Sequence, residues 1–226
     1  MVMKTSLNRR RRGIQWGVMQ NRLEDLDFAD DLCLLAQRHS EMREKLLVPS
    51  EIAKNGGLKI NEAKTKEMVV NVHGGKSFEI NGRRIERMDS FVYLASMVNP
   101  EGGAEDDVKT CIRKANGVFS QLYTVWRNNK ISKQTKLQIF NSNVKSVLLY
   151  GCETWNVTAE IRTKLQSSIN QSLQKIECVW WPDMISNEEL WHNTGQMPID
   201  IEIRKRKWMW IGHTLRKRGG AIEKDA

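Results

Sequence analysis

Two adjacent carboxylates, Asp30 and Asp31, lie between two short apolar segments in the run from Leu26 to Ala36. Apolar arms around an acidic pair are typical of a β-hairpin whose carboxylates lie at the turn. Two carboxylates between buried strands would repel each other, and no basic residue follows before Arg38, so a divalent cation would stabilise the pair. Mg²⁺ prefers oxygen ligands and often binds one or two carboxylates together with water and substrate phosphates. The pattern therefore predicts a magnesium site for phosphoryl transfer, with a solvated acidic turn as the alternative.

A second acidic pair, Asp106 and Asp107, serves as an internal comparison. It lies at the start of a segment with helical periodicity, where the helix dipole favours negative charge. An acidic pair by itself is therefore weak evidence for a metal site. The apolar arms around Asp30 and Asp31 are what distinguish that pair.

The strongest basic segment lies near the carboxyl end, where seven cations occur within 15 residues and tryptophans lie between them. The cations are Arg204, Lys205, Arg206, Lys207, Arg216, Lys217 and Arg218. Helical spacing predicts that Ile201, Trp208, Ile211 and Leu215 share one inward face and that the cations point to solvent or phosphate. Nucleic-acid binding and a solvated basic helix are equally compatible with this pattern.

Composition supports a nucleic-acid partner and argues against other classes of protein. The chain has 226 residues with 36 Lys and Arg against 27 Asp and Glu, which gives a formal charge of +9. Such a surplus favours polyanions through counterion release. No apolar run approaches the roughly 20 residues that span a bilayer, and no secretion signal is evident, so we expect an intracellular protein, nuclear or cytoplasmic and not secreted. The four cysteines form no Cys-x-x-Cys pair, which predicts reduced, buried thiols and no zinc site.

The elements that must position these residues indicate an α+β chain with a break near residue 100. Residues 1–22 form a basic, poorly ordered entry, and residues 23–100 carry short strands, a helix from about 40 and an Asn81-Gly82 turn. Residues 101–217 are helical, and 218–226 form a tail. Helices are expected at about 104–128, 132–148, 158–178 and 199–216, with the tryptophans of this half mainly in the core.

Several motifs in order resemble one family. Phe28-Ala29-Asp30-Asp31 is similar to the catalytic F/Y-A-D-D box of reverse transcriptases of non-LTR (LINE-type) retrotransposons. Gly57 to Asn61 with Lys64-Thr65-Lys66 resembles the next polymerase motif, and Phe91-Val92-Tyr93-Leu94 resembles the primer grip. Further blocks at 140–155, 181–191 and 208–215 resemble the thumb and the region after the polymerase, so the likeness covers about residues 14–217.

The resemblance implies a partial reverse-transcriptase palm, made of short antiparallel strands with a helix, followed by a mainly helical thumb and post-polymerase region. In such an RNA-directed DNA polymerase, Asp30 and Asp31 would bind catalytic Mg²⁺, and Lys64 or Lys66 would act near pyrophosphate. Phe91, Tyr93 and Leu94 would place the primer, and the partners would be an RNA template, a DNA primer and deoxynucleotides.

The family's fingers and first catalytic aspartate have no counterpart among these motifs. We therefore expect a fragment that cannot polymerise alone unless another chain supplies them, because two-metal chemistry uses carboxylates from both motifs. A non-enzymatic nucleic-acid-binding remnant is the alternative.

Overall fold

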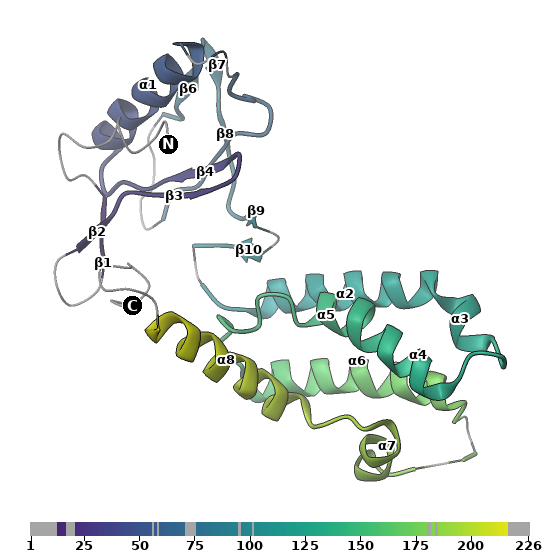
Figure 1. Cartoon of the computed structure of the whole chain (residues 1–226). Helices are drawn as coiled ribbons and strands as arrows, with labels where there is room; N and C mark the ends of the chain where they lie inside the picture. Colours follow the sequence, from purple (N-terminus) through teal and green to yellow (C-terminus); the bar gives the residue numbers. More distant parts are fainter. Residues whose placement is uncertain are drawn as a thin grey trace. The chain divides into compact units, whose positions relative to one another are not determined.

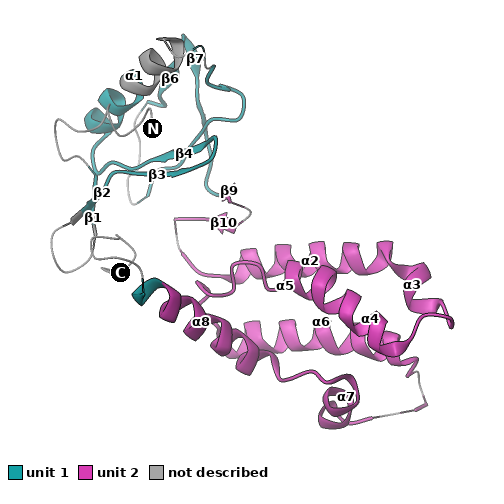
Figure 2. Ribbon diagram, in the orientation of Figure 1, with its two compact units in different colours: residues 1–91, 214–226 teal, residues 92–213 magenta. Residues whose placement is uncertain are grey.

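The computed structural model describes residues 13–16, 21–55, 57, 59–70, 76–94, 96–100, 102–179, 182–183 and 185–216. The chain divides into two compact units (Figure 2). Unit 1 comprises residues 1–91 and 214–226, and unit 2 comprises residues 92–213. The division thus falls before residue 100, because strand β10(Ser96–Val98) packs on the helix that follows it.

Unit 1 is built from strand pairs and one helix. Its elements are β1(Ile14–Trp16), β2(Asn21–Leu23), β3(Asp25–Phe28), β4(Asp31–Leu34), α1(His39–Asn55), β5(Lys66–Glu67), β6(Glu79–Ile80), β7(Arg83–Arg84) and β8(Glu86–Arg87). The pairs β1–β2, β3–β4 and β6–β7 are antiparallel, and β5–β8 is parallel. Among the described residues every sheet has two strands. The expected antiparallel pairs and helix are therefore confirmed, with β5–β8 as the exception.

The hairpin β6–β7 shows how local sequence defines these elements. Asn81 and Gly82 lie at its turn with φ values of 52° and 79°. Positive φ at both central residues is the geometry that Asn-Gly favours, so the predicted turn is confirmed. The Asn81 amide also donates to Glu62 over 2.9 Å, which ties the turn to the segment before β5.

Unit 2 is helical after the short strands β9(Phe91–Tyr93), which crosses the division, and β10. Its helices are α2(Glu105–Gln121), α3(Tyr123–Arg127), α4(Lys133–Ile139), π-helix η2(Phe140–Lys145), α5(Ser146–Leu148), α6(Ala159–Glu177), α7(Asn187–Thr194) and α8(Ile199–Leu215). α2 and α6 lie side by side and α4 to α5 pack against them (Figure 1). The four predicted helical segments are confirmed, whereas the short α7 was not predicted. The fold is thus α+β.

Side-chain caps explain where several helices begin. The Ser132, Thr158 and Ser186 hydroxyls accept hydrogen bonds from backbone N–H groups at the starts of α4, α6 and α7. Such caps satisfy donors that have no partner within the helix. At its end, α6 is closed by Cys178 in the left-handed conformation, with φ of 58°.

The hydrophobic core lies in unit 2. Helices α2 and α6 contribute apolar residues at helical spacing, such as Val108 and Cys111 on α2 and Leu165 and Leu173 on α6, each at most 2% exposed. In the described part of unit 1 the buried apolar side chains are Ile80 and Ile85. Unit 2 therefore has a core large enough to stabilise its helices, whereas unit 1 relies mainly on its local pairs and turns.

The thiols follow the sequence prediction in part. All four cysteines are free, and Cys111 and Cys152 are buried in the core of unit 2. Burial raises the pKa of the Cys111 thiol to about 11 and that of Cys152 to about 12. Cys178 is exposed at the end of α6, so its prediction as a core residue was wrong. It lies there because the chain leaves the helix at this position.

Among the described residues, no helix is long and apolar enough to cross a membrane.

Candidate functional site

The acidic pair lies at the tip of hairpin β3–β4. Phe28 pairs with Asp31, which leaves Ala29 and Asp30 as a two-residue loop. Ala29 has φ of 56°, a backbone region that glycine usually occupies at such turns. Asp30 and Asp31 are both exposed. The predicted hairpin is confirmed, and both carboxylates are exposed at its tip, Asp30 in the loop and Asp31 at the start of β4.

Neither carboxylate is neutralised by the part of the protein that the structure describes. The side chains of Asp30 and Asp31 make no hydrogen bond or ion pair there, and no group of three or more His, Cys, Asp or Glu side chains that could hold a metal occurs there either. Two free carboxylates fit Mg²⁺ as a partial ligand set, because this ion readily completes its shell with water and phosphate oxygens. A metal ion at this tip would depend on nucleic acid, a nucleotide or another carboxylate.

The apolar arms of the hairpin are more exposed than the sequence predicts. Leu26, Phe28 and Leu32 are 40%, 64% and 38% exposed. The expectation of buried strands around the carboxylates was therefore wrong. The cause is the sheet itself, since β3 and β4 pair only with each other among the described strands.

A lysine from α1 fixes the open end of the hairpin. The Lys45 ammonium is buried and donates to the Glu24 carbonyl over 2.9 Å and to the Leu35 carbonyl over 2.7 Å. Desolvation, followed by repulsion from Asp27, raises the pKa of Asp25, while Lys45 opposes the shift. Lys45 could not be identified from the sequence, because its carbonyl partners lie 21 and 10 residues away.

The structure distinguishes the two candidate lysines. Lys66 forms an ion pair with Glu86 across the β5–β8 pair, so its ammonium is already engaged. Lys64 is exposed, and its ammonium has no ion pair or hydrogen bond within the described residues. Its backbone N–H donates to Asn61, which holds the turn before β5. Of the two, Lys64 is the one whose charge is free to meet an anionic ligand.

The residues that resemble the primer grip lie on β9 and the turn after it. Phe91 and Tyr93 are half-buried in β9, and Leu94 follows with φ of 47° and 37% exposure. β9 pairs with β10, so the motif forms a tight hairpin. Ala95 lies outside the described residues.

The basic residues of α8 are only partly engaged by acids. Arg204 and Arg206 each reach an acid four residues earlier, Asp200 at 3.7 Å and Glu202 at 3.3 Å. Lys207 donates to the Trp155 carbonyl. The other basic candidates that the structure describes, Lys205 and Arg216, are exposed and have no ion pair there. Lys217 and Arg218 lie outside the described residues.

The apolar face predicted for α8 was wrong. Ile201, Trp208, Ile211 and Leu215 are 49%, 66%, 36% and 64% exposed. The inward positions are Ile199 and Ile203 instead, at 1% and 2%. The helix is apolar on more than one side, so spacing alone could not select the buried face.

The tryptophans divide between core and surface. Trp126 and Trp155 are both 3% exposed and belong to the core, as predicted. Trp208 and Trp210 are exposed on α8, at 66% and 47%, so the core prediction was wrong for them. Trp180 and Trp181 lie outside the described residues. α8 therefore exposes both cations and aromatic rings, the two kinds of side chain that bind nucleic-acid backbones and bases.

Comparison with known proteins finds similarity to a transposon-derived protein. The chain is 23% identical over 209 residues, covering 88% of this chain and 74% of the relative, to the uncharacterized transposon-derived protein F52C9.6 of Caenorhabditis elegans. A family model described as a domain of unknown function, DUF6451, matches residues 118–150, from the last turn of α2 to just after α5. No solved structure matches the chain. The sequence is thus similar to a transposon-derived protein along most of its length.

Proposed function

We propose that this chain is the palm-and-thumb segment of a reverse transcriptase from a non-LTR retrotransposon and that it binds an RNA–DNA template–primer. The observation that carries the proposal is the β3–β4 hairpin, which exposes two unpaired carboxylates at its tip, Asp30 in the loop and Asp31 at the start of β4. The similarity to a transposon-derived protein supports the same origin.

In this proposal the hairpin supplies part of a two-metal site. Mg²⁺ bound there would activate the primer 3′-hydroxyl and stabilise the leaving pyrophosphate. Asp30 and Asp31 would hold the ion, and Lys64 would donate charge or a proton near the pyrophosphate. Phe91, Tyr93 and Leu94 would position the primer. We expect this chain to need a further carboxylate for polymerisation, because the first catalytic motif has no match in it.

A second candidate is a nucleic-acid-binding protein without polymerase chemistry. The surface of α8 favours it, because Lys205 and Trp208 are exposed on a helix rich in cations. Stacking on such an aromatic ring contributes about 1 to 3 kcal/mol per base. Both candidates share the same nucleic-acid partner.

Primer extension on an RNA template with Mg²⁺ tests the proposal, alongside binding of the same template–primer at several salt concentrations. The variants are Asp30→Ala and a matched control, Asp106→Ala, which removes an exposed acid of the other pair. We expect salt-dependent binding by all three proteins and no extension. Extension that is lost only in Asp30→Ala would show that a carboxylate elsewhere in the chain completes the site. Absence of binding would refute both candidates.

A further inference from the structure

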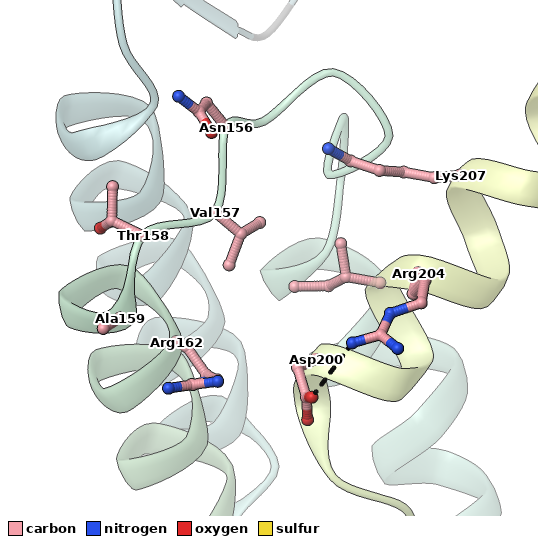
Figure 3. Close-up of a pocket in the computed structure, with 9 residues that line it drawn as sticks. Asn156, Val157, Thr158, Ala159, Arg162, Asp200, Arg204 and Lys207 are labelled. Carbon is pink, nitrogen blue, oxygen red and sulfur yellow. Dashed lines mark ion pairs between the residues drawn. The ribbon is translucent and has the colours of Figure 1, made fainter.

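A cavity of about 350 Å³ lies within unit 2, between the start of α6 and the first half of α8 (Figure 3). One wall is the segment that leads into α6, and the other is α8. The lining residues are Asn156, Val157, Thr158, Ala159, Arg162, Asp200, Ile203, Arg204 and Lys207. The motif resemblance assigns no role to the α6 side of this cavity.

The charge of the lining is strongly positive. Arg162 comes from α6, and Arg204 and Lys207 come from α8; against these three cations stands one carboxylate, Asp200. Arg162 is exposed, and its guanidinium has no ion pair or hydrogen bond within the described residues. Arg204 is held by Asp200 only at 3.7 Å, beyond hydrogen-bond distance. Two guanidinium groups therefore remain available to an anion.

The start of α6 adds a backbone donor to the same cavity. The Ile161 N–H is capped by the Thr158 hydroxyl, and the N–H group of Ala159, which lines the cavity, has no helical carbonyl partner. The positive end of the helix dipole reinforces the arginines. The Glu160 side chain does not line the cavity and is paired with Lys164, so it does not cancel this field.

We propose that this cavity binds a backbone phosphate of the nucleic acid, with Arg162 and Arg204 as its two guanidinium donors. The inference rests on the proposed nucleic-acid binding and assigns a specific site to it. Guanidinium groups match phosphate oxygens with paired hydrogen bonds. The lining contains no aromatic ring, so the cavity is suited to a phosphate and not to a base.

The neighbouring surface favours a polynucleotide over free phosphate. Trp208 follows Arg204 by one helical turn, on the same side of α8, and is 66% exposed. A phosphate in the cavity would place the adjacent nucleotide along α8, where its base can stack on this ring. Inorganic phosphate would bind in the cavity but would make no contact with Trp208.

The test measures binding of a fluorescein-labelled RNA–DNA template–primer to the full chain by anisotropy, at several salt concentrations. The variants are Arg162→Gln, Asp200→Asn and a control, Arg113→Gln, which removes an exposed arginine of α2 whose guanidinium donates to Thr110. We expect Arg162→Gln to weaken binding about tenfold and to reduce the salt slope by about 0.9, the contribution of one phosphate contact. Arg113→Gln should change the affinity by less than about twofold.

Asp200→Asn gives a change in the opposite direction. Removing the one carboxylate of the lining should tighten binding about threefold, an effect that loss of folding cannot produce. Equal effects of Arg162→Gln and Arg113→Gln, with wild-type binding intact, would overturn the phosphate site and leave the proposed function standing. No binding by the wild-type chain would overturn the proposed function itself. Calorimetric binding of inorganic phosphate that depends on Arg162, without an effect of Arg162→Gln on template–primer binding, would reassign the cavity to free phosphate.

Discussion

Replacing Asp107 by alanine should destabilise the folded chain far more than replacing its neighbour Asp106. Asp107 is 5% exposed in the first turn of α2. Its carboxylate accepts the Met97 backbone N–H over 3.1 Å and the Trp155 indole N–H over 2.8 Å. One side chain thus ties β10 and the loop before α6 to the start of α2.

The size of the effect follows from the groups left behind. Asp107→Ala leaves two donors in the protein interior without an acceptor, at about 1 to 3 kcal/mol each. It also removes a charge that the helix dipole stabilises, which contributes about 0.3 to 1 kcal/mol. We expect a loss of about 3 to 5 kcal/mol in the free energy of unfolding. Asp106 is exposed and forms a surface ion pair with Lys109, so Asp106→Ala should cost about 0.5 kcal/mol or less.

Urea unfolding followed by tryptophan fluorescence measures both variants, because Trp155 lies beside the lost carboxylate. Asp107→Asn adds a second comparison. Its amide can accept one of the two N–H groups but presents a donor to the other, so its loss of stability should lie near that of alanine. Equal midpoints for Asp106→Ala and Asp107→Ala would refute the assignment of Asp107 as the acceptor that joins these elements.

Three further outcomes concern the thiols of unit 2. Cys178→Gly should stabilise the chain by about 1 kcal/mol, because Cys178 holds φ of 58° at the end of α6 and glycine has no Cβ to strain there; thermal unfolding checks this, with Cys178→Ala expected to show no gain. At pH 8 a disulfide reagent should label Cys178 rapidly and reach Cys111 and Cys152 only after unfolding, because burial raises their pKa values to about 11 and about 12. The raised pKa values also predict how stability depends on pH. The contribution of the two buried thiols to the free energy of unfolding is fully present below the ordinary thiol pKa of 9.0 and is lost as the pH rises toward 11 or 12. Labelling of all three thiols at equal rates in the folded chain would contradict both the burial and the pKa shifts.

Sequence patterns predicted the local elements because these depend on neighbouring residues. The Asn81-Gly82 turn and the hairpin around Asp30 need only a few positions, and α6 needs only its periodicity and the Thr158 cap. Contacts between distant segments could not be read in this way. Lys45 reaches Glu24 through the packing of α1, which no local spacing encodes.

The buried face of α8 could not be predicted for a related reason. Its apolar residues surround the helix, so several faces were compatible with burial, and packing in unit 2 selected Ile199 and Ile203. The cavity beside it was equally inaccessible to sequence analysis. Arg162 and Arg204 are far apart in the chain, and nothing in their local sequence indicates that one space lies between their helices.

The two proposed activities, nucleic-acid binding and metal-dependent polymerisation, depend on units whose buried apolar cores differ greatly in size. The cavity with Arg162 and Arg204 lies in unit 2, whose helices share an extensive buried core. The carboxylates of the hairpin belong to unit 1, where Ile80 and Ile85 are the buried apolar residues among those described. Nucleic-acid binding by unit 2 therefore does not require a correctly formed metal site in unit 1. We therefore expect template–primer binding to persist when divalent metal is removed. Polymerase chemistry would additionally require ordered carboxylates in unit 1.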